Sequence, residues 1–163
     1  MTMSGIEHFP EPEGWTEEDL RKFGYSRFAV SVFDHWLTRE EWDSNPFVSL
    51  ERARSHGVES TFLEQNRRFR AFYRNIFGGG VFRVTGSRLR QQVVWHARWD
   101  RRLKKAVTAM VEDRIWGAEF YAPASHIRIS SADSRTDTML LERSADEDAI
   151  RKLVMSHGLY LIS

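Results

Sequence analysis

Large apolar side chains recur at helical spacing in the middle of this chain. They follow one another at steps of seven, four and three positions: Phe62, Phe69, Tyr73 and Ile76. Steps of this size return to the same side of an α-helix, so the pattern predicts a helix over 60–77 that buries one face. Three consecutive glycines at 78–80 end it, because glycine is a poor helix former.

Four shorter helices are predicted from a capping residue before them or a glycine after them. Thr16 and Thr38 each precede acidic residues, whose charge suits the positive end of the helix dipole. Ser144 stands three positions before Glu147, which is the spacing of a capping box. The predicted spans are 16–24, 39–43, 49–56 and 144–157.

A longer helix is predicted over 88–116, after a strand over 81–85. Its apolar stripe has four members: Trp99, Leu103, Val107 and Met110. Gly117 follows, at the position of a C-terminal cap. Residues 91–97 leave an alternative open, because this run also fits a strand paired with 81–85.

The last third of the chain has the short apolar runs of a β-sheet. Pro, Ser, Asp and Thr separate these runs, as is typical of turns between strands. The predicted strands span 119–122, 126–130, 138–142 and 159–162. Residues 25–37 are apolar and β-branched, and their pattern fits either a strand or a buried helix.

We therefore predict a single compact domain of the α+β class. Residues 1–15 form an irregular lead-in, and 16–117 form a mainly helical N-terminal two-thirds. Residues 118–163 form a small β-β-β-α-β unit, a sheet with one helix. Helices that come first and strands that come later are typical of α+β folds, in which the two kinds of element are segregated.

Composition narrows the class of protein. With 41% hydrophobic and 29% charged residues, the chain has the composition of a globular domain rather than a disordered tail. It lacks the roughly 20-residue apolar run of a membrane helix, and its acidic N-terminal stretch lacks the pattern of a secretory signal. The absence of cysteine excludes disulfides and cysteine nucleophiles. We expect a cytoplasmic protein with no membrane contact.

Charge is strongly segregated along the chain. The formal net charge is only +1, but residues 66–105 contain twelve basic residues and a single acid, Asp100. The remaining residues therefore have a net charge of −10. Arginine outnumbers lysine 20 to 4, and its planar fork suits bidentate contact with phosphate or carboxylate groups.

Helical geometry places these cations on faces that the core does not need. Arg67, Arg70 and Arg74 fall together on the first long helix, beside its apolar face. On the second, basic residues lie opposite the apolar stripe: Arg98, Arg101, Arg102 and Lys105. Trp95 and His96 offer rings on which unpaired bases can stack. The sequence thus predicts a binding protein for nucleic acid or another polyanion.

Two other classes of function remain open. The ten surplus acids elsewhere in the chain can neutralise the basic region internally, or that region can face an acidic protein surface, as in an immunity, antitoxin or inhibitor protein.

A nuclease is the second alternative. Two Arg–His pairs with five residues between them, Arg90/His96 and Arg151/His157, resemble the phosphate clamp and proton-transfer group of helical HEPN-type ribonucleases. This match covers two residues in each case.

The remaining motifs predict structure rather than chemistry. Gly78 to Gly80 lack the Gly-Lys-Ser/Thr of a phosphate loop, and no HExxH pair is present among the six histidines. Asp133 and Asp137 are expected in a hairpin turn, and the six tryptophans mainly in the core. We predict no catalytic residue, no metal ligand and no cofactor.

Overall fold

The computed structural model describes residues 9, 15–86, 90–112, 114–115, 117–132 and 135–163. Within this part, the helices are α1 Glu17–Lys22, α2 Arg39–Ser44, α3 Leu50–Ser55, α4 Glu59–Ile76, the short 3₁₀ helix η2 Phe77–Gly79, α5 Arg101–Val111 and α6 Glu147–Ser156. The strands are β1 Tyr25–Ser31, β2 Val81–Thr85, β3 Gln92–His96, β4 Glu119–Ala122, β5 Ile127–Ser130, β6 Thr136–Glu142 and β7 Tyr160–Ile162.

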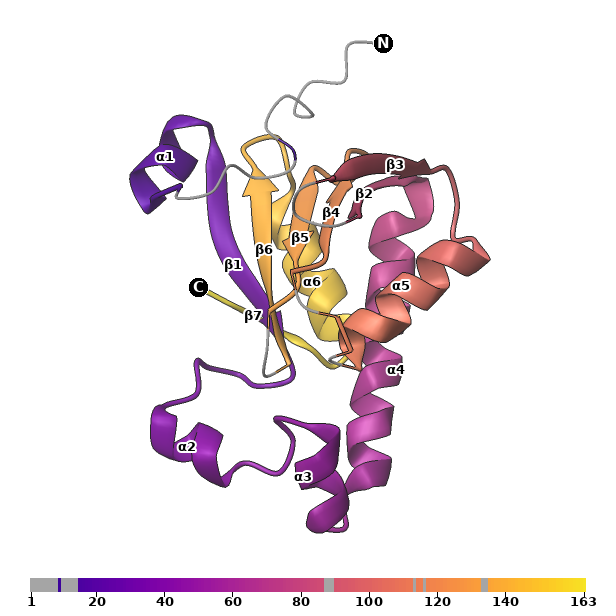
Figure 1. The fold of residues 1–163 in the computed structure, drawn as a ribbon. Coiled ribbons are helices and arrows are strands. Elements are labelled where there is room, and N and C mark those ends of the chain that lie inside the picture. The colour runs from indigo at the N-terminus through magenta and orange to yellow at the C-terminus, as the bar shows by residue number, and fades with distance from the viewer. Residues whose placement is uncertain (1–8, 10–14, 87–89, 113, 116, 133–134) are drawn as a thin grey trace.

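All of these strands join one antiparallel sheet, in the order β3-β2-β4-β5-β6-β1-β7 (Figure 1). One row of paired residues crosses six strands: Trp95, Phe82, Tyr121, Arg128, Leu140 and Arg27. Directly paired residues in a sheet point to the same face. This row therefore marks one face, and its sequence neighbours mark the other.

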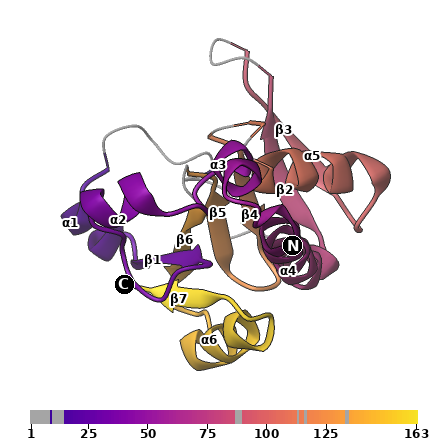
Figure 2. The ribbon, with the colours of Figure 1, turned by 90° about the horizontal axis from the view of Figure 1, so that it is seen from below.

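Helices α4, α5 and α6 cover the second face, where the main core lies. Phe72 and Phe77 from the region of α4, Leu103 from α5 and Val154 from α6 are all fully buried. They pack against sheet residues such as Phe120 in one continuous cluster. Seen from below, α4 lies between α5 and α6 (Figure 2). This arrangement leaves the outward side of α4 exposed between its two neighbours.

The opposite face of the sheet has a smaller aromatic core around a buried arginine. The Arg128 guanidinium lies 4.7 Å from the ring centroid of Tyr25 and 5.1 Å from that of Tyr121. Phe9 packs on Tyr121 with ring centroids 5.9 Å apart, and Leu20 of α1 is buried nearby. The two faces thus have separate cores, and the cationic helices border only the first.

The structure confirms a single α+β domain but corrects its organisation. The prediction of a mainly helical N-terminal two-thirds is wrong, because β1, β2 and β3 all lie there. The last third has the predicted β-β-β-α-β order, yet its strands are part of one large sheet. β6 pairs with β1, so that Phe28 lies opposite Met139. Such long-range pairing leaves no local signal in the sequence.

The prediction of a helix over 88–116 is also wrong in its first half. The alternative strand is present as β3 and pairs with β2, and α5 begins only at Arg101. Asp100 explains this start, because its side chain accepts hydrogen bonds from the backbone N–H groups of Arg102 and Leu103. Trp99 consequently precedes the helix rather than belonging to its stripe.

Most shorter elements are confirmed within one or two residues. Thr16 and Thr38 both cap a helix as predicted, each in a capping box, and the undecided apolar run contains β1. The predicted box at Ser144 is wrong, since Asp146 caps α6 through the backbone N–H of Ala149. Asp146 competes at closer range for the same orphan N–H groups.

Candidate anion-binding site

Helix α4 is anchored to the sheet by apolar packing and by one buried polar bond. Phe72, Tyr73 and Ile76 face the sheet and are at most 3% exposed. The Tyr73 hydroxyl donates a hydrogen bond to a carboxylate oxygen of Asp137 on β6. Burial, and then the negative charge of Asp137, raise the pKa of Tyr73 well above its ordinary value. Both groups therefore hold the helix in a fixed position with the phenol protonated.

A pocket of about 760 Å³ opens on the outward side of α4. Arg70 and Arg74 stand one helical turn apart and form one ridge, while Ala71 and Asn75 form the next. The other lining side chains come from beyond α4: Trp99, Lys104 and His157. A small alanine between these longer side chains leaves room for a ligand over the helix surface. The volume is in the range of small-molecule binding sites.

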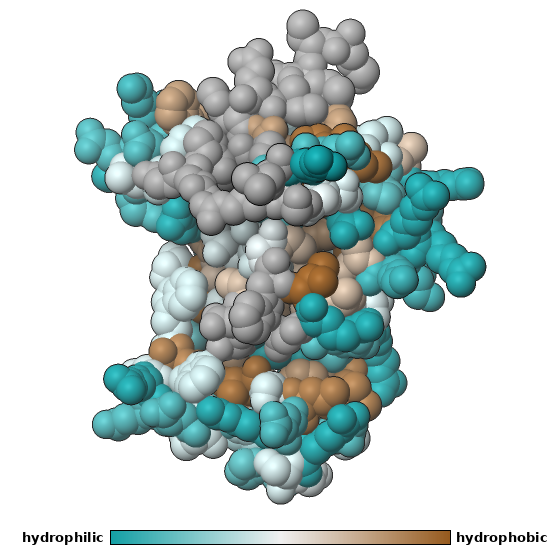
Figure 3. Space-filling model, in the orientation of Figure 1, coloured by the Kyte–Doolittle hydropathy of each residue, from teal (hydrophilic) through white to brown (hydrophobic). Residues whose placement is uncertain are grey.

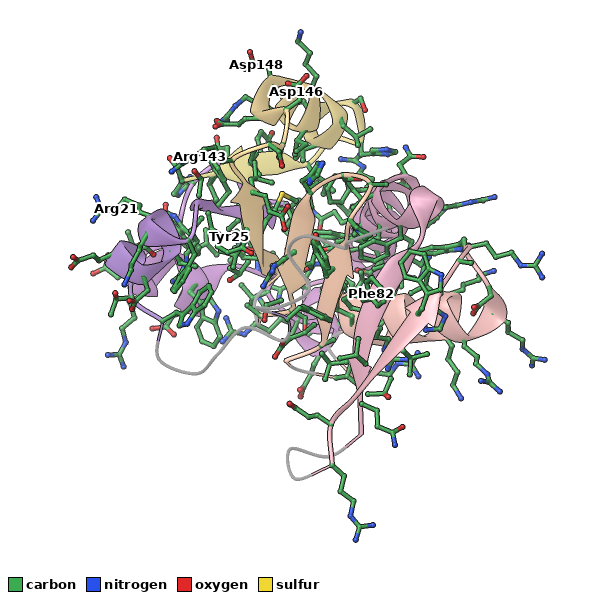
Figure 4. The ribbon with its side chains drawn as sticks, turned by 90° about the horizontal axis from the view of Figure 1, so that it is seen from above. Arg21, Tyr25, Phe82, Arg143, Asp146 and Asp148 are labelled. Atoms are coloured by element: carbon green, nitrogen blue, oxygen red, sulfur yellow. The ribbon has the colours of Figure 1, made fainter. Side chains whose placement is uncertain are left out.

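Three cations and no carboxylate line this pocket: Arg70, Arg74 and Lys104. Arg70 is 30% exposed and forms a long ion pair with Glu112, in which 3.8 Å separate Arg70 Nη1 from Glu112 Oε1. Arg74 and Lys104 form no ion pair with any residue that the structure describes. Figure 3 shows hydrophilic side chains gathered over α5 at the edge of the molecule, and Figure 4 shows nitrogen-tipped side chains projecting from the same helix. An anion entering the pocket therefore meets cations that have few competing acids.

The side of the pocket next to α6 offers hydrogen-bonding side chains. His157 is the C-cap of α6, as the sequence predicted. Its Nε2 lies 2.8 Å from Asn75 Nδ2, and its ring meets Phe72 edge-on with centroids 6.1 Å apart. This contact joins α4 to the end of α6 through two residues that are 82 positions apart in the chain. It fixes the orientation of both polar side chains at the pocket.

Trp99 contributes an aromatic surface to the same pocket. Its ring is partly buried and stacks on Phe77, with centroids 6.5 Å apart and planes 30° apart. Because Phe77 is fully buried, Trp99 is supported from the core while it lines the pocket. The arrangement combines a cationic cluster with an aromatic ring held in a fixed position.

The predicted basic residues of α5 extend this charge away from the pocket. Four predicted basic residues are exposed and form no ion pair within the described chain: Arg101, Arg102 and Lys105 on α5, and Arg98, which precedes the helix instead of lying on it as predicted. Arg67 on α4 is exposed as well, but Glu64 lies 3.3 Å from its Nε. We call the surface of Arg70, Arg74, Arg98, Arg101, Arg102, Lys104 and Lys105 the basic band.

The two predicted stacking residues lie elsewhere. Trp95 is 45% exposed, but it belongs to the aromatic face of the sheet and packs on Phe82 with ring centroids 4.5 Å apart. His96 is only 5% exposed, and its Nδ1 lies 2.8 Å from Asp100 Oδ2. That hydrogen bond, followed by one from the backbone N–H of Leu103, lowers the pKa of Asp100 to about 2. His96 therefore organises the start of α5, and its buried ring has no face for a base.

Sequence reasoning misses five residues of the pocket: Ala71, Asn75, Trp99, Lys104 and His157. Lys104 is counted in the basic region but is not among the residues predicted for the binding face. The pattern places Trp99 in an apolar stripe and His157 at the end of the helix predicted over 144–157. The signal that unites them is the packing of α4 between α5 and α6, which no local pattern contains.

Other polar clusters serve the fold. Asp137 lies within β6 and is buried, so the prediction of a turn there is wrong; Asp133 lies outside the described residues. Arg135 donates to Asn66 and stacks 3.9 Å from the Phe62 ring centroid, away from solvent. Among described residues, no group of three histidine or carboxylate side chains is placed to hold a metal ion.

The two Arg–His pairs do not form a common site. Arg151 donates to the carbonyl of Leu161 and pairs with Glu147 on its own helix, while His157 faces Asn75. Arg90 is exposed before β3, and His96 is buried on that strand. Neither pair presents an arginine and a histidine together at one pocket.

Comparisons with protein-family models, with curated proteins and with solved structures find no match to this chain. None of the helices in the described ranges combines the length and the apolar composition that a bilayer crossing requires. The fold and the site together define an α+β domain with a cationic pocket on its helical side. Function must therefore be argued from that pocket.

Proposed function

We propose that this protein is a cytoplasmic binding module that holds nucleic acid through its phosphate groups on the basic band. One observation supports the proposal above others: Arg70, Arg74 and Lys104 converge on a pocket whose lining contains no carboxylate. Cations clustered in this way repel one another, and an anionic ligand relieves that repulsion. Phosphate oxygens also match the guanidinium fork of two of the three.

The band offers cations at more than one point, as a chain of phosphates requires. The pocket reaches α5 at Lys104, and exposed cations flank that residue on the same helix at Arg101, Arg102 and Lys105. A strand that lies along this surface exchanges condensed counterions for protein cations, so its affinity falls as salt is added. The band is on helices rather than on the aromatic sheet face, so we assign no role to Trp95 or His96.

Binding is tested by fluorescence anisotropy of labelled 20-nucleotide RNA, single-stranded DNA and duplex DNA. The pocket variant combines Arg70→Gln, Arg74→Gln and Lys104→Gln. Its matched control removes the same charge far from the band, with Arg21→Gln, Lys22→Gln and Arg143→Gln. Figure 4 shows Arg21 and Arg143 on the opposite side of the molecule from α5.

We expect single-strand binding to weaken with added salt in the wild type and in the control. For single strands, each lost phosphate contact lowers the slope of log affinity against log salt by about 0.7, so the pocket variant should lose about 2 units of slope. Over the fourfold step from about 50 to 200 mM salt, this difference corresponds to roughly a 16-fold smaller loss of affinity. Absence of wild-type binding at 50 mM, or equal slopes in both variants, would overturn the proposal.

A protein partner is the second candidate, favoured by aromatic side chains outside the band. Trp36 is 56% exposed and Trp42 is 38% exposed, in the region of α2 that extends away from the sheet (Figure 1). Exposed tryptophan is common at protein interfaces. A protein of the immunity, antitoxin or inhibitor type would form a stable complex that Trp36→Ala weakens, with no salt-sensitive binding of nucleic acid. Size-exclusion chromatography of captured complexes, compared with the anisotropy titration, separates the two candidates.

A further inference from the structure

We infer that the pocket on α4 recognises a nucleoside phosphomonoester, the chemical group found at a phosphorylated strand end or in a free mononucleotide. The inference rests on the proposed function, because it names the ligand of the same site. It assigns the pocket a different task from the rest of the basic band. The pocket contacts phosphates of the strand as proposed above but binds a terminal one most tightly, and the α5 cations hold the rest of the strand.

The charge of the pocket supports a group with more than one negative charge. Arg70, Arg74 and Lys104 meet at one place, whereas Arg101, Arg102 and Lys105 are spread along exposed turns of α5. An internal phosphodiester has a single negative charge. A terminal phosphomonoester has about −1.5 to −2 at pH 7 and three oxygens that accept hydrogen bonds. Two guanidinium groups and one ammonium match those oxygens better than they match an internal diester.

The rest of the lining supports a nucleoside on that phosphate. Trp99 is held against Phe77 and lines the pocket, so it offers a ring on which a base can stack at little cost in side-chain entropy. Asn75 and His157 lie on the α6 side and offer donors and acceptors to polar edges of a base or sugar. A site for phosphate alone has no need of these groups. The volume of about 760 Å³ also exceeds what a lone phosphate requires.

The first arm of the test uses free ligands and isothermal calorimetry. The probes are AMP, adenosine and inorganic phosphate, each with the wild-type protein at about 50 mM salt. We expect AMP to bind at least about tenfold more tightly than either part, because the phosphate contacts and the stacked base act together. AMP binding no tighter than that of inorganic phosphate or of adenosine would overturn the inference.

Variants separate the two halves of the pocket. Arg74→Gln should abolish binding of AMP, while Trp99→Phe should weaken AMP several-fold and leave inorganic phosphate unchanged. Quenching of tryptophan fluorescence by AMP should also be smaller in Trp99→Phe. Thermal melting checks that each variant is folded, and the triple control at Arg21, Lys22 and Arg143 should bind AMP as the wild type does. AMP binding unaffected by Arg74→Gln would place the ligand elsewhere and overturn the inference.

The second arm compares 3′-labelled oligonucleotides with a 5′-phosphate and a 5′-hydroxyl, and 5′-labelled ones with either group at the 3′ end. We expect one terminal phosphate to tighten binding by about tenfold, an effect that Arg74→Gln removes. Equal binding of all oligonucleotides, without competition by AMP, would overturn the inference and leave the proposed function intact. AMP binding without any binding of oligonucleotides would overturn the proposed function and leave the assignment of the pocket's ligand intact.

Discussion

The bond between Tyr73 and Asp137 gives the sharpest test of how α4 is held in place. Tyr73→Phe removes one hydroxyl and nothing else, because the aromatic ring keeps its neighbours Phe69 and Phe77. The carboxylate of Asp137 stays buried, 6% exposed, and loses its phenolic donor. The backbone N–H of Ala132, 3.3 Å from the other carboxylate oxygen, remains. The change therefore isolates one buried, charge-assisted hydrogen bond.

A hydrogen bond to a charged group contributes about 1.5–3 kcal/mol to stability, so we expect Tyr73→Phe to lower the free energy of unfolding by that amount. For a chain of this size, each kcal/mol shifts the melting temperature by about 2–4 °C, which gives an expected drop of roughly 3–12 °C. Calorimetry and urea unfolding followed by circular dichroism measure it. Tyr160→Phe is the control, because Tyr160 is 46% exposed and should change stability by at most about 0.5 kcal/mol.

The pH dependence of this variant provides a second readout. Burial raises the pKa of Tyr73 well above 10 in the folded protein, whereas the unfolded chain releases the same proton near the ordinary value. Its stabilising effect is thus complete below the unfolded pKa and is lost as pH rises above it. The stability gap between wild type and Tyr73→Phe should narrow above pH 10. A gap below about 0.5 kcal/mol at neutral pH would refute the assigned role of this bond.

Three further changes test other parts of the structure. Gly80→Ala should destabilise the protein by about 1–3 kcal/mol in thermal melts, because Gly80 has φ +97° and its Cβ would lie 2.2 Å from Cη2 of Trp95; a neutral effect would contradict that packing. Asp100→Asn should make stability less dependent on pH between 4 and 2 than in the wild type: the pKa of Asp100 is lowered to about 2, so its contribution is present above its ordinary pKa and lost as pH falls; urea midpoints that fall equally with pH in the variant and the wild type would argue against the His96–Asp100 bond. Glu112→Gln should tighten single-strand binding a few-fold in anisotropy titrations, since it removes the acid nearest Arg70; weaker binding would mean that Glu112 positions Arg70 rather than competes for it.

Local signals in the sequence predict many of the elements. Thr16 and Thr38 place a side-chain oxygen before acidic residues, and each forms the expected cap because only neighbouring atoms are involved. The glycines from 78 to 80 end α4 for an equally local reason. By contrast, the pairing of β1 with β6 joins segments more than a hundred residues apart. Periodicity leaves 25–37 undecided, because consecutive residues are buried in the second half of β1, from Ala29 to Ser31, and such a run has no alternating pattern.

The candidate site also has features that the sequence predicts and features that depend on the packing of distant segments. The sequence predicts that α4 and α5 are basic, and Arg70 and Arg74 do lie together. It does not predict that α6 ends beside α4, which brings His157 to Asn75. His96 shows the same limit of local patterns. The sequence predicts that its ring is available for stacking, but strand alternation turns the ring toward the helices and buries it.

The surplus of acids made internal neutralisation the simplest explanation of the basic region, and the fold argues against it. Acids of the described chain reach only part of that region: Glu64 pairs with Arg67 and Arg68, and Glu112 lies near Arg70. The other acids are concentrated on α1, α2 and the first turn of α6, where they suit the helix dipoles. The folded protein therefore keeps the two signs of charge apart at some electrostatic cost. A ligand that brings its own negative charge to the pocket accounts for that separation, whereas a purely structural role for these cations does not.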